Sequence, residues 1–449
     1  MKHPKVTLCV VLISLFCSTL QAQTLTLDSC LALARRNNYE IRNSRLEVEK
    51  SQALKQQVFT KFFPQLSIRG LGYYAVNPLI HFSIDDIQSS DMRDLLQSLY
   101  EIVESESDIK KELDLMKTGA SGSLVAVQPL FTGGRIVNGN KLANIGIEAS
   151  QLQADMKERD VLEEIESSYY LVVGLQEKVS TVDAALSLID SLERVVELAY
   201  TNGLVTRSDK LQIGLKRNEM LANKQKLSSG IRLSRRLLCQ QVGIDYSDDL
   251  QFSDLQDEIQ KPVLFLFSDR GDTLRPETRL LQLNIDAEQL RKKMTLGEAM
   301  PQLAIVGATF YGNIIKKEPT SNGIALLSLS IPITDWWETR HKVQQHDIAI
   351  DQARMMQEHY SKMMSLEEEK AYSDMMDAWT MIRSDSSALA MAQENYRLST
   401  LNYQAGAATL AEVLQAQALL LQAHNALTDN RTAYIMARRR LTDLRHEQR

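Results

Sequence analysis

An internal duplication limits the fold of this chain more than any other feature. Residues 62–68 recur as residues 299–305, and both segments share the order Pro-Gln-Leu followed two positions later by isoleucine. Two further landmarks follow in each half, Pro129 and Gly203 in the first, Pro332 and Gly406 in the second. The interval from proline to glycine is 74 residues in both halves. Equal spacing over this length predicts two copies of one structural unit.

The two copies differ in a single interval near their beginnings. The first two proline landmarks are 65 residues apart in the first half but only 31 in the second. The 34 extra residues fall in 77–118, a segment with ten acids and four Lys or Arg. A helix-like centre covers Met92 to Val103. We therefore predict an acidic surface insertion that only the first repeat carries.

Each half is expected to contain the same four kinds of element. A first helix covers 28–61 or 277–297, and Asp28 is the candidate N-cap of the earlier one. The expected strands are 65–75 and 122–131 in the first half, 302–311 and 323–333 in the second. The expected long helices are 136–199 and 339–402, and the return helices are 208–242 and 410–444. Turns at Gly203 and Gly406 reverse the chain.

The expected strands alternate apolar and polar residues. In the last strand Ala325, Leu327, Leu329 and Ile331 form one face, and Ser328 and Ser330 fall on the other. In the first strand Gln65, Ser67 and Arg69 alternate with Leu66 and Ile68. This period of two is typical of a sheet with two different faces. It fits a membrane strand between lipid and a lumen, but a soluble hairpin alternates in the same way.

The long helices carry apolar residues at heptad spacing, which is typical of a coiled-coil seam. In the first long helix this series is Val172, Leu175, Val179, Val182, Leu186, Ile189, Glu193, Val196 and Tyr200. In the last return helix it is Leu410, Val413, Gln417, Leu420, His424 and Leu427. Each half therefore reads as a strand hairpin joined to a long helical hairpin.

Residues 1–22 have the features of a secretory signal peptide. Lys2 and Lys5 precede a short apolar core, and Ala22 is a suitable cleavage position. The alternative, lipidation at Cys17, is disfavoured because a bulky phenylalanine precedes that cysteine. After cleavage only Cys30 and Cys239 remain, and we expect both to pack as small apolar residues. The expected organisation is a signal at 1–22, repeats at 23–260 and 276–449, and a linker at 261–275.

Charge and hydropathy exclude some classes of protein. The net charge of −6 argues against nucleic-acid binding, which calls for a basic face. After the signal no apolar run reaches the ~18 residues of a transmembrane helix. A membrane location would then require strands. Four strands per chain have open edges that cannot lie in lipid, and the smallest closed membrane barrels have about eight strands. Several copies must then share one barrel; three would supply twelve strands, and two are not excluded.

The order of elements resembles that of the TolC family of outer-membrane efflux proteins. The resemblance covers the mature chain and includes Phe-Pro-Gln-Leu at 63–66, Gln-Pro-Leu-Phe-Thr-Gly-Gly-Arg at 128–135, and Gly-Leu-Val at 203–205. It implies a mainly α-helical homotrimer with a shared twelve-stranded β-barrel in the outer membrane of a Gram-negative bacterium and a coiled-coil tunnel across the periplasm. It also implies two partners at the hairpin ends, a periplasmic adaptor and an inner-membrane transporter of RND or ABC type.

The resemblance also assigns a periplasmic gate. Asp209 lies six residues after Gly203, and Tyr403 three before Gly406, where family members place an acid and a tyrosine. Glu412 matches the first of two acids that form charged selectivity rings, but Gln415 stands where the second would be. An arginine expected two residues after Gly406 is Ala408 here, so a lock using it cannot form. The competing interpretation makes Glu412 a solvated residue at a helix N-terminus.

Aromatic residues near the strand ends are candidates for interfacial belts: Trp336 and Trp337 after the last strand, Tyr73, Tyr74 and Tyr311 at the other rim. Paired methionines at 355–356, 363–364 and 375–376 are interpreted as packing residues rather than as copper ligands. The sequence contains no nucleophile elbow, phosphate loop or HExxH motif, so we expect no metal site, no cofactor and no enzymatic activity. The predicted function is the outer-membrane channel of a tripartite efflux pump. Two alternatives stay open, the exit duct of a type I protein secretion system and a periplasmic coiled-coil structural or adhesive protein.

Overall fold

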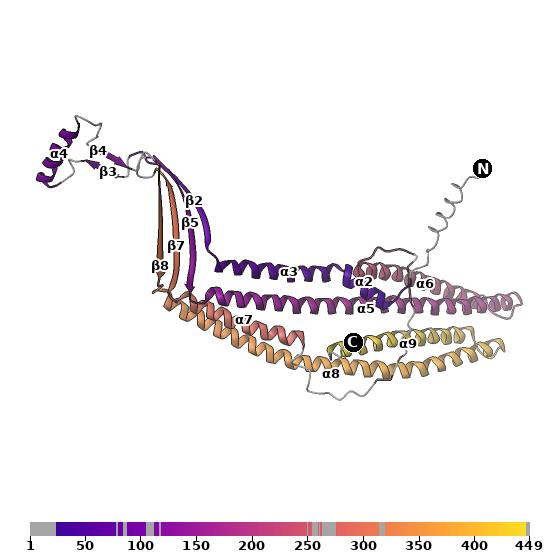
Figure 1. Cartoon of the computed structure of the whole chain (residues 1–449). Coiled ribbons are helices and arrows are strands. Elements are labelled where there is room, and N and C mark those ends of the chain that lie inside the picture. Colours follow the sequence, from indigo (N-terminus) through magenta and orange to yellow (C-terminus); the bar gives the residue numbers. More distant parts are fainter. Residues whose placement is uncertain are drawn as a thin grey trace, which may run out of the picture. The chain divides into compact units, whose positions relative to one another are not determined.

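The computed structural model describes residues 24–77, 80–83, 88–104, 112–115, 118–248, 250–253, 259, 261–262, 275–313 and 319–445 (Figure 1). The predicted signal peptide lies outside these residues, as does nearly all of the predicted linker. The chain forms two compact units. Unit 1 comprises residues 1–50, 148–282 and 355–449, and unit 2 comprises residues 51–147 and 283–354. Each unit therefore draws on both sequence repeats.

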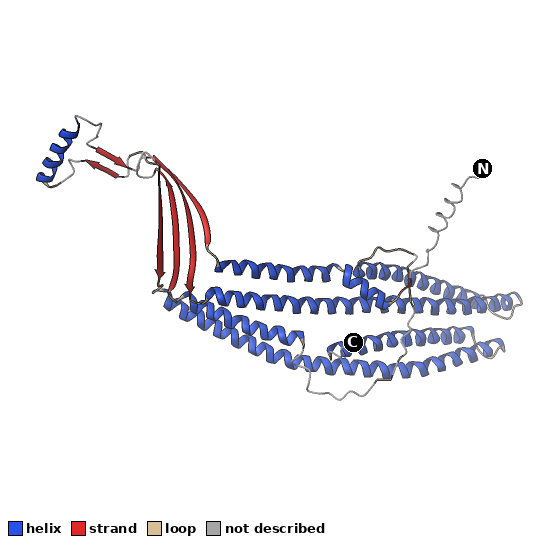
Figure 2. Cartoon of the chain, in the orientation of Figure 1, coloured by secondary structure: helices blue, strands red, loops and turns tan. Residues whose placement is uncertain are grey.

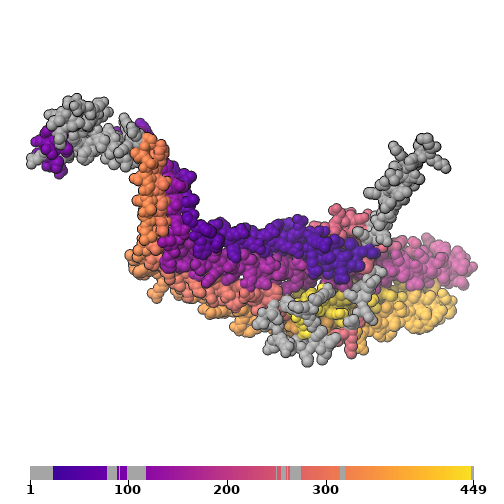
Figure 3. Space-filling view, in the orientation of Figure 1, coloured from indigo at the N-terminus to yellow at the C-terminus, as the bar shows by residue number. Residues whose placement is uncertain are grey.

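Unit 2 contains an antiparallel four-stranded sheet in the order β2-β5-β7-β8 (Figure 2). Its strands are β2 (Gln65–Tyr74), β5 (Thr118–Thr132), β7 (Gln302–Gly312) and β8 (Thr320–Ser330). The two predicted hairpins, one from each repeat, meet where β5 pairs with β7. Figure 3 shows them side by side, purple beside orange. The last strand was predicted to reach residue 333, which is wrong, because β8 ends two residues before Pro332, a residue that has no N–H for a ladder.

The registers assign every strand residue to one of two faces. Leu66 and Ile68 share one face with Ala325, Leu327 and Leu329, as predicted. We call this the apolar face; its strand positions carry no charged residue. The opposite, mixed face holds Arg69 together with serines and apolar residues. Leu66, Ile68, Leu327 and Leu329 are each 62% or more exposed in the single chain.

The long helices match their predicted positions closely. They are α5 (Arg135–Thr201), α6 (Arg207–Val242), α8 (Asp335–Gln404) and α9 (Leu410–Leu444). The heptad seam is a genuine core, because Val172, Val182, Ile189 and Val196 are all buried. Burying such side chains stabilises the structure by about 1.5–3 kcal/mol each. No helix in the described part of the chain is both long and apolar enough to cross a membrane.

The first predicted helix is in fact two helices, α2 (Leu27–Asn37) and α3 (Tyr39–Phe59), followed by a short 3-10 turn, η1 (Thr60–Phe62). The buried residue Asn38 divides them. Its Oδ1 accepts hydrogen bonds from the backbone N–H groups of Glu40 and Ile41, and its Nδ2 donates to the carbonyl oxygen of Gln241. Asp28 is not the N-cap either. Thr26 caps α2 through its hydroxyl, and Asp28 lies in the first turn.

The smaller elements complete both units. Strands β1 (Thr24–Leu25) and β6 (Gln251–Phe252) pair in parallel, beside a core that includes Cys30 and Cys239. Both cysteines are buried, as predicted, and burial raises the pKa of the Cys30 thiol to about 12. Helix α7 (Pro276–Glu298) opens the second repeat. In the acidic insertion, β3 (Ile80–Ser83) pairs with β4 (Glu112–Leu115), and the predicted helix is present as α4 (Ser90–Glu104).

Candidate functional site

Both long helical hairpins turn at the predicted glycines. Gly203 has φ of 74° and Gly406 has φ of 70°, a left-handed conformation that only glycine adopts without cost. The following N–H closes the helix in each case. Leu204 donates to the carbonyl oxygen of Ala199, and Ala407 donates to that of Asn402, both at 2.8 Å. The two helical hairpins therefore have equivalent turns, and the residues that follow each turn glycine occupy equivalent positions.

In the first hairpin, Asp209 stabilises the start of α6. Its carboxylate accepts hydrogen bonds from the Thr206 N–H at 2.9 Å and the Thr206 hydroxyl at 2.7 Å. The Asp209 N–H donates to the Thr206 hydroxyl oxygen in return, which completes a capping box. Such a cap stabilises a helix by about 1 kcal/mol. The Asp209 carboxylate is therefore committed to a structural contact.

In the second hairpin, Glu412 occupies the matching position of α9. Thr409 caps this helix, and the Glu412 N–H donates to the Thr409 hydroxyl oxygen at 3.3 Å. The Glu412 side chain is exposed, and within the described residues its carboxylate has no hydrogen bond or ion pair. Gln415 is exposed one helical turn later, on the same face. The equivalent acids of the two repeats thus differ, since one is bound and the other is open to solvent.

The spacing Thr-x-x-Asp at 206–209 and Thr-x-x-Glu at 409–412 is the sequence signal that would have revealed both caps. Thr206 and Thr409 are not among the predicted site residues, which were placed by their distance from the turn glycines. The distinction between the two acids depends on side-chain contacts, which a motif does not specify.

Tyr403 joins the two hairpin ends. Its ring packs on a core that includes Val196 of α5, Ile213 of α6 and Val413 of α9. Burial, and then the negative charge of Asp209, raise the pKa of the Tyr403 hydroxyl. The Tyr403 hydroxyl therefore lies within the electrostatic reach of the Asp209 carboxylate.

The two hairpins hold their own helices together differently. Near the end of the first, three basic residues of α6 pair with acids of α5 in the ion pairs Lys210–Glu197, Arg217–Asp190 and Lys224–Asp183. Residues 410–428 of α9 contain a single charged residue, Glu412. The second hairpin end is therefore packed through apolar contacts, and Glu412 is the only formal charge on that stretch.

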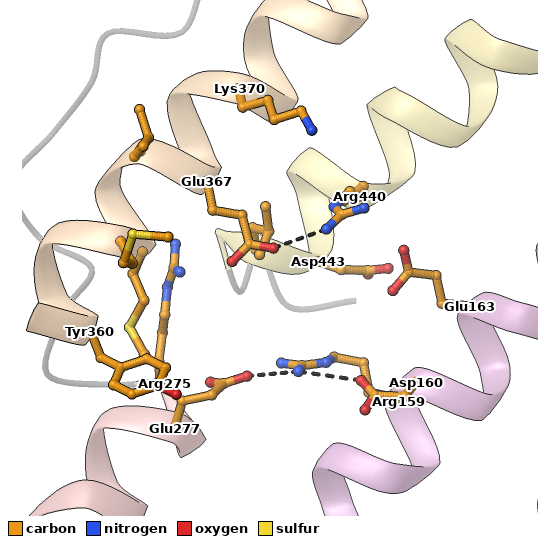
Figure 4. A pocket seen from close by; sticks show the side chains of 14 residues that line it. Arg159, Asp160, Glu163, Arg275, Glu277, Tyr360, Glu367, Lys370, Arg440 and Asp443 are labelled. Atoms are coloured by element: carbon orange, nitrogen blue, oxygen red, sulfur yellow. Dashed lines mark hydrogen bonds and ion pairs between the residues drawn. The ribbon is translucent and has the colours of Figure 1, made fainter. Parts of the chain in front are cut away.

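A cavity of about 600 Å³ lies in unit 1 among α5, α7, α8 and α9 (Figure 4). Opposite charges pair across it. Arg159 of α5 donates to Glu277 of α7 at 2.6 Å, and Arg440 of α9 donates to Glu367 of α8 at 3.0 Å. Burial raises the pKa of Glu277, but its hydrogen bonds and the Arg159 charge outweigh this and lower it. The Arg159–Glu277 pair connects the first repeat to the second, whereas Arg440 and Glu367 both belong to the second repeat.

The predicted aromatic residues lie at opposite ends of the sheet. Tyr74 pairs with Thr118 at the far end of β2, and Tyr311 is next to last in β7. Both belong to the apolar face, whereas Tyr73 belongs to the mixed face. Trp336 and Trp337 lie in the first turn of α8, soon after β8 ends, and are 53% and 74% exposed. The Trp336 indole N–H donates to the carbonyl oxygen of Ala299.

Comparison with known proteins gives one family and several solved structures. Residues 277–445, the second repeat, match the family described as outer membrane efflux protein. The fold matches CusC with a TM-score of 0.76 and 15% identity, covering 93% of this chain and 91% of that one. It matches the outer membrane protein VceC of Vibrio cholerae (TM-score 0.70, 15% identity, 93% and 95%). It also matches the MtrE outer membrane channel of Neisseria gonorrhoeae (0.71, 15%, 93% and 88%). The sequence finds no match among curated proteins.

These matches confirm the predicted resemblance and the predicted fold class, a mainly helical chain with a few antiparallel strands. Of these proteins, CusC forms a transmembrane channel and MtrE is an outer membrane channel.

Proposed function

We propose that this chain, whose second repeat carries the outer membrane efflux protein pattern and whose fold is that of CusC, VceC and MtrE, is the outer-membrane channel of an efflux pump. It is a passive conduit from the periplasm to the exterior. The observation that carries this function is the sheet, with four strands, two unpaired edges and an exposed apolar face.

The edges of the sheet support an oligomer. Among the described residues, strands β2 and β8 each pair on one side only, and unpaired edges in hydrocarbon leave backbone groups without hydrogen-bond partners. Closed membrane barrels need about eight strands or more. Three copies joined β2 to β8 close a barrel of twelve strands, with the apolar face toward lipid and the mixed face toward the lumen. Tyr74 and Tyr311 then mark one interface, and Trp336 and Trp337 the other.

The ends of the helical hairpins support a docking role. Leu204 is 78% exposed, Leu211 is 59% exposed and Leu215 is 69% exposed at the end of the first hairpin. Exposed leucines grouped in this way are typical of protein–protein contacts. Their partners are a periplasmic adaptor and, through it, an inner-membrane transporter, which supplies the energy and selects the substrate.

Fractionation of the native protein tests this function. We expect the chain in outer-membrane extracts as a species that migrates as a trimer in SDS and becomes a monomer on boiling. Deletion of the gene is expected to lower the resistance of the cells to compounds that efflux pumps export. Recovery as a monomer in the soluble periplasmic fraction would favour the coiled-coil structural protein and refute the channel.

The second helical hairpin places a negative charge, Glu412, at the narrow end of this conduit. Three copies of Glu412 around a threefold axis form one ring of carboxylates, which attracts cations and repels anions. We expect Glu412→Gln to lower the cation-to-anion permeability ratio on the order of twofold, measured from reversal potentials of single channels in a salt gradient. The Thr409 cap survives, because it uses the backbone N–H of residue 412.

Two further variants test the same ring. Gln415→Glu adds a second carboxylate one turn away and is expected to raise the permeability ratio. Asp209→Asn weakens the Thr206 capping box, so it is expected to lower hairpin stability, and any fall in the ratio measures the share of the Asp209 charge. If Glu412→Gln left the cation-to-anion permeability ratio unchanged, Glu412 would be a solvated residue at the start of α9 and not a selectivity residue.

A further inference from the structure

Helix α4 is a feature of the first repeat alone. It forms the connection between β3 and β4 inside the acidic insertion, whereas the second repeat connects β7 to β8 through residues 313–319 only. A 15-residue helix on its own is marginal in water, so its persistence calls for a packing partner. Of its apolar residues, Met92 is 51% exposed and Leu95 is 57% exposed in the single chain.

The apolar residues of α4 follow a helical repeat. Met92, Leu95 and Leu96 are spaced three and four apart, and the sequence continues this spacing at Leu99, Ile102 and Val103. Read as heptads, Met92 and Leu99 occupy one seam position, and Leu95 and Ile102 the other. The side of the helix opposite Leu95 holds Gln97, and Asp94 is exposed on the polar side. The pattern is that of one helix of a short coiled coil.

The charges of α4 argue against lipid as the partner. Amphipathic helices that lie on membranes carry Lys and Arg on their polar face. In its sequence α4 has four acids and a single basic residue, Arg93. An anionic membrane surface repels such a helix. The apolar stripe therefore calls for a protein surface of the same apolar character.

We propose that α4 packs against the α4 helices of two other copies of this chain, forming a three-helix bundle outside the membrane. This rests on the proposed trimer. The sheets of three copies joined edge to edge bring three β3–β4 hairpins to the same end of one barrel. Tethering to a common body raises the effective concentration of the helices to the millimolar range or above, which lets a contact of only two heptads form. The acidic sides then face solvent, where their repulsion is screened.

Cysteine cross-linking on intact cells tests the bundle. In a threefold parallel bundle Leu95 of one copy faces Leu95 of the next, whereas Gln97 points outward. After mild oxidation we expect Leu95→Cys to give a disulfide-linked dimer on denaturing gels, and Gln97→Cys to stay monomeric. Met92→Cys, on the same stripe, repeats the test if Leu95→Cys lowers expression. The natural Cys30 and Cys239 are buried, so the introduced thiol is the accessible one.

The outcomes separate the bundle from the channel. Cross-linking at 92 or 95 but not at 97 supports the bundle. A trimer on unboiled gels without any α4 cross-link overturns the bundle and leaves the channel standing. Equal cross-linking at 95 and 97 also overturns the bundle, because the α4 helices would then be close together without packing through one defined face. Absence of the trimer itself refutes the proposed function and the bundle with it.

Discussion

Replacing Leu327 with arginine will prevent this protein from accumulating in the outer membrane. Leu327 lies on the apolar face of β8 and is 64% exposed in the single chain. In the proposed barrel its side chain contacts lipid, and arginine on the lipid face costs about 2–4 kcal/mol near the bilayer midplane. Threefold symmetry applies this cost once in each copy. The measurement is the amount of trimer in outer-membrane fractions.

Ser328→Arg is the matched control. Ser328 is the neighbouring residue on the mixed face, the face that also holds Arg69, so its arginine would enter the lumen. We expect normal membrane levels for this variant and a change only in conductance. If Ser328→Arg abolished the trimer and Leu327→Arg did not, the assignment of the two faces would be reversed. Equal tolerance of both variants would argue against a membrane location for the sheet.

Gly133→Ala is expected to cause the largest loss of stability among conservative substitutions. Gly133 precedes α5 with φ of 62°, where an L side chain is strained. A Cβ at this position would overlap the carbonyl oxygen of Gly297 in α7, so the backbones of the two repeats meet here. Strain and overlap together should cost about 2–5 kcal/mol per chain. The measurement is the temperature at which the trimer dissociates on SDS gels.

Gly214→Ala serves as the control for this substitution. Gly214 lies inside α6 with negative φ, and a Cβ there meets nothing within 4 Å. Alanine is the better helix former by about 0.5–1 kcal/mol, so this variant should be as stable as the natural protein or slightly more so. A dissociation temperature equal to that of the natural protein for Gly133→Ala would show that the two repeats separate at this contact without penalty.

The long, periodic elements were predictable because their signals are local. The turn glycines, the four long helices and the four strands all lie within a few residues of their predicted positions. Two predictions about the first helix were wrong, and in each case a side-chain hydrogen bond decided the outcome. The first helix breaks because the Asn38 amide finds a partner in Gln241, some 203 residues away. The cap of α2 is Thr26 because its hydroxyl, and not the Asp28 carboxylate, reaches the Ser29 N–H.

At the candidate site the sequence indicated the residues but not their roles. Equal spacing from Gly203 and Gly406 makes Asp209 and Glu412 look equivalent. Only the side-chain contacts separate them, since the Asp209 carboxylate is bound by Thr206 and the Glu412 carboxylate has no partner among the described residues. The cavity pair Arg159–Glu277 had no sequence signal, because its members come from different repeats.

The duplication by itself determined that this chain builds two similar hairpin units, each with strands and a long helical seam, because periodicity and turn residues act within one segment. The tertiary structure decided how the two repeats combine. It placed β5 beside β7 to make one sheet, left the outer edges of β2 and β8 without a partner strand among the described residues, and packed Gly133 against Gly297. Those outcomes depend on backbone groups and side chains far apart in sequence, which find their partners only when both repeats are folded.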